Sequence, residues 1–177
     1  MHYIIDNILL RNIEIEDLKD FYLQKNDPEV SSFLGGFSTG YSIEDIKDWY
    51  DYHRKKKDEL ILSMIDRNNG LCIGHVGLYN IDYRIRIAEF AIMIGDKSYW
   101  DKGIGSKISR NMINYGFDEL NLNRISSTFL SDNYRSIKMC EKLGFKKEGE
   151  LRKAQFKNGV YKNILLLGLL KEEFTNA

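Results

Sequence analysis

The sequence lacks the features that would mark it for export, for a membrane or for nucleic acid. Its 177 residues contain one proline and two cysteines, and acidic and basic residues balance at 26 each. Two cysteines cannot make the disulfide framework of a small secreted protein, and zero net charge gives no general attraction to nucleic acid or anionic lipid. The longest apolar run, ILLLGLL, is far shorter than the ~20 residues of a membrane span. We therefore expect a cytoplasmic protein with no nucleic-acid partner and no membrane partner.

The sequence also lacks internal repeats, low-complexity tracts and the paired Cys/His spacing of a zinc site, so we expect no metal. With 43% hydrophobic and 29% charged residues, the composition is that of an ordinary globular protein. A chain of this length is long enough for one well-packed core. We expect residues 1–177 to form a single domain.

Hydrophobic periodicity predicts an α+β fold. Residues spaced as in a helix occur over about 15–27, 42–56, 104–120 and 133–144, and the first of these helices is expected to stop before Pro28. The second starts with Ser42 three residues before Asp45, a pair typical of a capping box. Strand-like runs occur over about 8–12, 59–66, 71–82, 86–95 and 124–130, and two more flank the turn Asn158-Gly159. The segment from Phe33 to Tyr41 mixes glycines with aromatic residues, has neither period, and is predicted to be a mobile loop.

The stretch YWDKGIGSK, which begins at Tyr99, places two glycines directly before a predicted helix. A helix N-terminus exposes free N–H groups and a partial positive charge, so such a turn can bind phosphate, although it can equally be an ordinary turn. It is not a Walker A loop, which requires Gly-Lys-Ser/Thr after four residues. It is not a dinucleotide fingerprint either, because the third glycine is replaced by Ile108.

This neighbourhood resembles the GNAT superfamily of acyl-CoA-dependent N-acyltransferases. In that family a strand, a Gln/Arg-x-x-Gly-x-Gly/Ala turn and a helix hold the pyrophosphate of coenzyme A. Here the turn is WDKGIG, the strand is AEFAIMIG, and NYRSIKMCEKLGF is similar to the family's Asn-x-x-Ser/Ala…Glu-Lys-x-Gly-Phe segment. The resemblance spans most of residues 8–170. Within the family it is strongest to the branch that contains ribosomal-protein N-acetyltransferases, together with amino-sugar and polyamine acetyltransferases.

The resemblance implies a mixed, mostly antiparallel central sheet that splays at the cofactor site and is flanked by about four helices. It implies acetyl-CoA as the cosubstrate, held by strand backbone, by the turn and by the last helix. The residues so implied are Ile92, Met93, Ile94, Asp101, Lys102, Gly103, Ile104, Gly105, Ser106, Lys107, Asn133 and Ser136. Ordinary alternatives remain: the strand backbone can pair with the next strand, Asn133 can be a helix N-cap, and Ser136 can face solvent.

Two positions depart from the family pattern. Trp100 stands where the family has Gln or Arg, so the turn loses a side-chain donor and must rely on main-chain amides. Cys140 stands where many members have the tyrosine that protonates the departing thiolate. Cys140 is a weak candidate for that acid, because a cysteine on the inner face of a helix is more often a packing residue.

Acetyl transfer to an amine requires a neutral amine, yet an alkylamine with a pKa near ~10 is mostly protonated at pH 7. Glu89 matches the family's general base and lies among apolar neighbours in a predicted strand, where half-burial would raise its pKa. Its alternative role is a salt bridge with Arg84 or Arg86. His75, inside a predicted hairpin strand, is expected to be a packed histidine and not a catalytic one.

The aromatic residues of the glycine-rich loop, Phe33 and Phe37, are candidates to line the acceptor site, and they can equally belong to the core. The sequence therefore predicts an acetyltransferase that moves an acetyl group from acetyl-CoA to a primary amine by direct attack. The acceptor can be a peptide N-terminus, an amino sugar, an aminoglycoside or a polyamine. The alternative is a non-catalytic CoA-binding sensor or interaction protein with the same fold. A homodimer is possible on the family resemblance.

Overall fold

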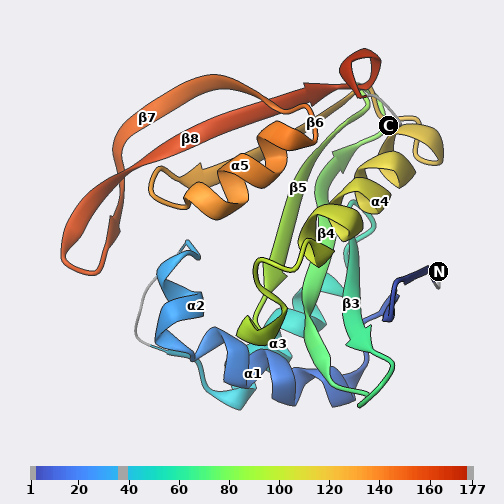
Figure 1. The fold of residues 1–177 in the computed structure, drawn as a ribbon, viewed down its shortest axis with the longest axis vertical. Helices are drawn as coiled ribbons and strands as arrows, with labels where there is room; N and C mark the ends of the chain where they lie inside the picture. The colour runs from blue at the N-terminus through green and yellow to red at the C-terminus, as the bar shows by residue number, and fades with distance from the viewer. Residues whose placement is uncertain (1–2, 36–39, 175–177) are drawn as a thin grey trace.

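The computed structural model describes residues 3–35 and 40–174. Eight strands form one sheet in the order β1-β2-β3-β4-β5-β6-β8-β7 (Figure 1). In chain order these strands are β1 (Tyr3–Ile5), β2 (Ile8–Asn12), β3 (Leu60–Asp66), β4 (Cys72–Asp82), β5 (Ile87–Ile94), β6 (Arg124–Leu130), β7 (Lys146–Lys157) and β8 (Val160–Leu170). The predicted α+β architecture is confirmed, with β1 as an additional strand that forms a hairpin with β2.

Five α-helices occur in the described part of the chain, one more than the sequence predicted. They are α1 (Leu18–Lys25), α2 (Pro28–Ser32), α3 (Ile43–His53), α4 (Ile104–Asp118) and α5 (Tyr134–Lys142). The additional helix, α2, begins where Asp27 accepts hydrogen bonds from two backbone amides and Pro28 occupies the first helical position. The predicted pairing of Ser42 with Asp45 forms a capping box at the start of α3.

The sheet is antiparallel except where β5 meets β6. These two strands pair in parallel over only three residues each, Ile87–Glu89 with Arg124–Ser126. Beyond Glu89, β5 continues to Ile94 and stays paired with β4, while β6 continues to Leu130 and stays paired with β8. The two halves of the sheet therefore separate after Glu89, and the predicted splay is confirmed.

The two faces of the sheet carry separate cores. On one face α4 packs with Phe90 of β5 and Ile125 of β6 in the larger hydrophobic cluster. On the other face Met93 packs with side chains of α1, α2 and α3. Side chains alternate along a strand, so Glu89 and Ala91 project to the same face as Met93. Both residues are exposed, which leaves this part of the sheet uncovered.

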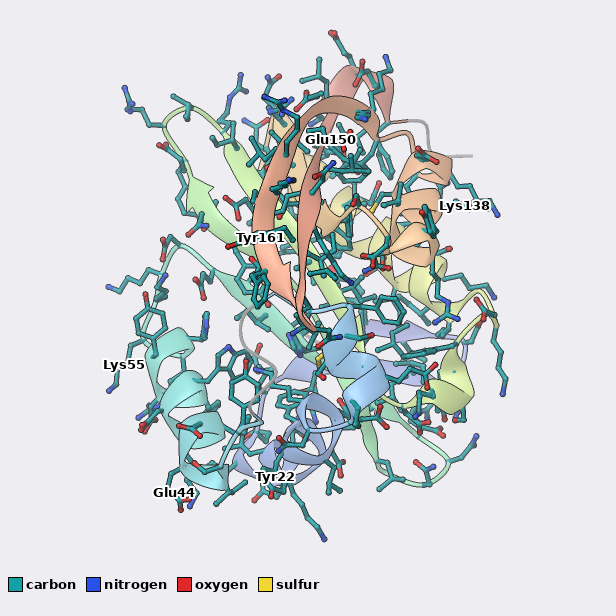
Figure 2. The ribbon with its side chains drawn as sticks, turned by 90° about the vertical axis from the view of Figure 1, so that its left-hand side faces the viewer. Tyr22, Glu44, Lys55, Lys138, Glu150 and Tyr161 are labelled. Atoms are coloured by element: carbon teal, nitrogen blue, oxygen red, sulfur yellow. The ribbon has the colours of Figure 1, made fainter. Side chains whose placement is uncertain are left out.

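The last two strands form a long hairpin that curves beside α5 (Figure 1). β7 is the edge of the sheet, and its pairing with β8 is interrupted by two register shifts. Figure 2 places Glu150 and Tyr161 on this hairpin, with Lys55 and Lys138 on opposite sides of the molecule. Within residues 3–35 and 40–174, no helix is both long enough and apolar enough to cross a membrane.

Candidate functional site

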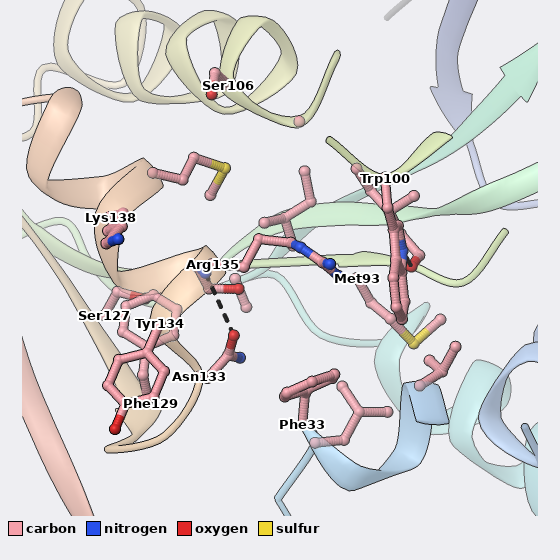
Figure 3. A pocket seen from close by; sticks show the side chains of 18 of the residues that line it. Phe33, Met93, Trp100, Ser106, Ser127, Phe129, Asn133, Tyr134, Arg135 and Lys138 are labelled. Atoms are coloured by element: carbon pink, nitrogen blue, oxygen red, sulfur yellow. Dashed lines mark hydrogen bonds between the residues drawn. The ribbon is translucent and has the colours of Figure 1, made fainter. Parts of the chain in front are cut away.

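The separation of β5 from β6 opens a cavity of about 660 Å³. One wall is β5, and the others are the turn before α4, the start of α5, the strand β6 and the end of α2 (Figure 3). The cavity-lining residues that the sequence had predicted are Phe33, Ile92, Met93, Ile94, Asp101, Gly103, Gly105, Ser106, Asn133 and Ser136. The predicted site residues Glu89, Lys102, Ile104, Lys107 and Cys140 do not line it.

The backbone of β5 presents alternate residues to this gap. The amide of Gly95 donates to the carbonyl of Ile73 on β4 at 2.9 Å, and Gly74 lies opposite Ile94. In an antiparallel ladder, residues that bond to the partner strand alternate with residues that face away from it. Met93 therefore directs its backbone at β4, whereas Ile92 and Ile94 direct theirs into the gap. The prediction of a ligand-facing backbone is consistent with the register for Ile92 and Ile94 and inconsistent with it for Met93.

The glycine turn has two different requirements for glycine. Gly103 is the residue before α4 and has φ +79°, a conformation that costs other residues about 1–2 kcal/mol. Gly105 has an ordinary conformation, but a Cβ there would lie 3.1 Å from the Ile94 side chain. The first gives the turn its shape, and the second lets α4 lie close to β5.

The N-terminus of α4 supplies backbone donors to the cavity. Lys107 N already donates to the Gly103 carbonyl, and Lys107 Nζ contacts Asp6 at 2.7 Å, so this lysine is engaged elsewhere. The three preceding amides, those of Ile104, Gly105 and Ser106, belong to the first turn, where a helix has no internal acceptor for them. They are the donors that this turn can offer to an anion.

Trp100 is held in place in the cavity wall. Its indole Nε1 donates to the carbonyl of Ile94 at 2.7 Å, so one of the two carbonyls that face the gap already has a partner. The ring also contacts Phe33 edge-on and lies 4.4 Å from the guanidinium carbon of Arg135. Trp100 therefore offers the turn no free side-chain donor, because its single N–H is bonded to the Ile94 carbonyl.

The start of α5 supplies polar and charged groups. Asn133 Oδ1 accepts a hydrogen bond from the Ser136 amide at 3.3 Å. Asn133 is therefore the N-cap of α5, which the sequence analysis gave as its alternative role. Three cations of α5 also line the cavity, namely Arg135, Lys138 and Lys142. Sequence reasoning missed them, although the spacing i, i+3, i+7 places three such residues on one side of a helix.

The structure contradicts the candidate role of Cys140 as an acid. Its side chain is 0% exposed, belongs to the core beneath α4 and does not line the cavity. Burial raises the pKa of the Cys140 thiol to about 12. Cys140 is therefore a packing residue, which was the alternative interpretation.

Glu89 lies where the two strands begin to separate, but it is not half-buried as the sequence predicted. Its side chain is exposed, because neither α3 nor the hairpin covers this part of the sheet face. The alternative salt bridge with Arg84 or Arg86 is not formed, and no described residue makes an ion pair with Glu89. An exposed carboxylate at the mouth of the splay is accessible to a ligand.

The remaining candidates divide between core and site. His75 is packed against Phe21 and Trp49, and burial lowers its pKa to about 3, so it is the packed histidine that we expected. Phe33 is 36% exposed and lines the cavity. Phe37 lies outside the described residues. In the described ranges no group of three His, Cys, Asp or Glu side chains could hold a metal ion.

These features fit a long anionic ligand. The gap offers backbone groups of Ile92 to an extended chain, while the first turn of α4 and the cations of α5 offer donors and positive charge to phosphates. The aromatic ring of Trp100 and the thioether of Met139 add apolar surface to the same cavity. This combination is what the pantetheine arm and pyrophosphate of coenzyme A require.

Comparison with known proteins agrees with this assignment. Residues 7–146 match the family model described as "Acetyltransferase (GNAT) domain". Spermidine N(1)-acetyltransferase of Escherichia coli (strain K12) is 30% identical, and the alignment covers 95% of this chain and 88% of that protein. A Bacillus subtilis protein provisionally named a ribosomal N-acetyltransferase is 34% identical over 60% of this chain and 57% of its own length.

Among solved structures, spermidine N-acetyltransferase from Vibrio cholerae in complex with CoA and spermine has a TM-score of 0.86 and 26% identity, covering 96% of this chain and 98% of that one. The predicted enzyme, and not the predicted sensor, is thus supported by named acetyltransferases along the whole chain. The chain belongs to the GNAT acetyltransferase family, and it is an acetyl-CoA-dependent N-acetyltransferase.

Proposed function

We propose that this enzyme acetylates a primary amine of the polyamine class and that Glu89 is its general base. The observation that carries the proposal is the exposed Glu89 carboxylate at the point where β5 and β6 separate, with no ion-pair partner among the described residues. Relatives named spermidine N(1)-acetyltransferase, aligned over 95% of the chain, support the choice of acceptor.

Glu89 is suited to both tasks that such an acceptor imposes. An alkylamine with a pKa near ~10 must lose a proton before it attacks, and a carboxylate at the site can accept that proton directly or through a water molecule. The remaining nitrogens of a polyamine stay charged and are attracted by the same carboxylate. Acetyl-CoA supplies the activated acetyl group, and its thiol, with a pKa near ~8.5, can leave as thiolate without an obligatory acid.

A second, smaller cavity supports an acceptor with an aliphatic segment. Its volume is about 120 Å³, and it shares Phe33, Gly35, Thr128 and Phe129 with the main cavity. Its other lining residues are Leu130, Gln155 and Ile164. The Phe33, Phe129, Leu130 and Ile164 side chains of this recess can pack against the methylene chain between two amines. An amino sugar, with hydroxyl groups on nearly every carbon, would leave those groups without partners there.

The proposal is tested by thiol release from acetyl-CoA with a panel of amines: putrescine, spermidine, spermine, glucosamine, an aminoglycoside and peptides with free N-termini. The expected result is the highest kcat/KM with a polyamine. Turnover confined to sugars or peptides would refute the polyamine assignment. Acetyl-CoA binding with no turnover of any amine would favour the alternative of a non-catalytic CoA-binding sensor.

Glu89→Gln tests the base. We expect kcat to fall by about 10²-fold or more with an altered pH profile, because a positioned base contributes 10²–10⁴-fold. The calorimetric Kd for acetyl-CoA should stay at the wild-type value. Glu44→Gln, which neutralises an exposed carboxylate on α3, is the matched control and should leave kcat unchanged. A wild-type pH profile in Glu89→Gln would show that Glu89 is not the general base.

We also propose that the chain forms homo-oligomers through the β7–β8 hairpin. β7 is a sheet edge, and the hairpin exposes Leu151, Phe156, Val160 and Tyr161. A spermidine N-acetyltransferase of similar fold, from Vibrio cholerae, is described as dodecameric. Light scattering coupled to size-exclusion chromatography should show an assembly that Phe156→Lys dissociates, and a wild-type monomer would contradict the proposal.

A further inference from the structure

Arg135 crosses the cavity from α5 to the opposite wall. Its side chain extends toward Trp100, on the far side of the gap (Figure 3). The guanidinium carbon lies 4.4 Å from the centre of the indole ring. Nε and Nη2 contact the two carboxylate oxygens of Asp101 at 3.0 and 3.1 Å. One face and one edge of the guanidinium are therefore fixed by the turn that precedes α4.

The other two cations that line the cavity are not held in this way. Lys138 and Lys142 form no ion pair with any described residue. Arg135 and Asp101 are both substantially exposed, with side chains 48% and 70% accessible. An exposed ion pair of this kind contributes little to stability, so fold stability does not explain why the pair spans the site.

The guanidinium retains donors for a ligand. It has five N–H groups in a rigid fork, and Asp101 engages Nε and Nη2. The two N–H groups of Nη1 bond to no described residue, and they lie beside the turn whose amides are available at the α4 N-terminus. Trp100 cannot supply a donor itself, because its N–H is bound to Ile94.

We propose that Arg135 binds the pyrophosphate of acetyl-CoA, oriented for this by the ring of Trp100 and the carboxylate of Asp101. The turn thereby receives from α5 the side-chain donor that its own sequence lacks. A stacked and ion-paired guanidinium loses less conformational freedom on binding than a mobile lysine would. Trp100, which touches Arg135, is a positioning residue in this arrangement. The inference rests on the use of acetyl-CoA and is independent of the acceptor and of Glu89.

The test compares ligands that differ in their phosphates. Calorimetry without acceptor measures the Kd of CoA and of 3′-dephospho-CoA, which keeps the pyrophosphate, and kcat/KM is measured with S-acetylpantetheine, which has no phosphate. Arg135→Gln should weaken CoA and dephospho-CoA equally, by about 10- to 100-fold, the range expected for hydrogen bonds to a charged group. Its kcat/KM with S-acetylpantetheine should be that of the wild type.

Two further variants separate charge from orientation. Arg135→Lys keeps the charge but loses the fork and the flat stacking surface, and it should weaken CoA by an intermediate factor. Trp100→Leu should weaken CoA by about threefold to tenfold in the wild-type background and have no effect in Arg135→Gln. Arg54→Gln removes an equally exposed arginine that is ion-paired to Asp51, away from the cavity, and should change nothing.

Three outcomes would overturn the inference. The first is wild-type affinity for CoA in Arg135→Gln. The second is a loss of affinity that disappears with dephospho-CoA, which would assign Arg135 to the 3′-phosphate. The third is an equal loss for S-acetylpantetheine, which would indicate a distorted site. Because the binding arms contain no amine, a failed polyamine assignment leaves this result unaffected.

Discussion

Replacement of Cys140 by alanine distinguishes a packing residue from a catalytic acid. Cys140 is 0% exposed in the core, so the structure predicts that kcat with acetyl-CoA stays within about twofold of wild type, whereas loss of a general acid would lower it by about 10²–10⁴-fold. Removal of one buried sulfur should lower the free energy of unfolding by about 1 kcal/mol, which for a chain of this size is a decrease in Tm of about 2–4 °C.

The rate at which the Cys140 thiol reacts provides an independent quantitative test of its burial. With a pKa of about 12, Cys140 is about one part in 10⁴ thiolate at pH 8, whereas a free cysteine of pKa ~8.5 is about one quarter thiolate. The native protein should thus react with Ellman's reagent more than about 10³-fold more slowly than the same protein in denaturant. A Cys72→Ala background leaves Cys140 as the single thiol. A fast reaction of the native Cys72→Ala protein with Ellman's reagent would refute the packing role of Cys140. A 100-fold fall in kcat in Cys140→Ala would refute it as well.

Three further predictions concern the stability of the fold. Gly103→Ala places a side chain at φ +79° and should lower the free energy of unfolding by about 1–2 kcal/mol, as measured by chemical denaturation. Burial lowers the pKa of His75 to about 3, so between pH 6.5 and 3 the unfolded chain binds a proton that the folded chain does not. The free energy of unfolding should therefore decrease as the pH is lowered through this window. The decrease should be less steep in His75→Leu. Burial would raise the pKa of Asp17, but hydrogen bonds led by that from Arg11 outweigh burial and lower it. The stabilisation by Asp17 is therefore present above its unfolded value near ~3.9 and is lost as pH falls below it, so Asp17→Asn should be less stable at pH 7, with a deficit that shrinks at pH 3.

The parts of the fold that sequence predicted correctly are those with local causes. The capping box at Ser42 and Asp45, the hairpin turn at Asn158-Gly159 and the glycine turn before α4 all form as predicted. The sequence did not predict α2, because the residue before a proline disfavours the helical conformation and the first helix was expected to stop before Pro28. The combination of Asp27 as cap and Pro28 at the first helical position is itself a helix start signal.

Burial at the site could not be predicted from local sequence. Glu89 has apolar neighbours along β5, which suggested half-burial, but its exposure depends on whether an element covers that face of the sheet, and none does. Arg135 is a comparable case. Its position on α5 could be predicted from the sequence. Its ion pair with Asp101 could not, because that contact depends on how far β5 and β6 separate, which is a property of the whole sheet.

Groups of opposite charge are separated along the length of β5. The cations of α5 and the free amides of α4 lie near the Ile94 end, where Trp100 is bonded. Glu89 does not line the cavity and lies five residues from Ile94, or about 17 Å along an extended strand. An anionic cofactor is therefore attracted toward the Ile94 end of β5 and a cationic acceptor toward the Glu89 end. A neutral or anionic acceptor would gain nothing from this arrangement, which is why it supports the proposed polyamine acceptor.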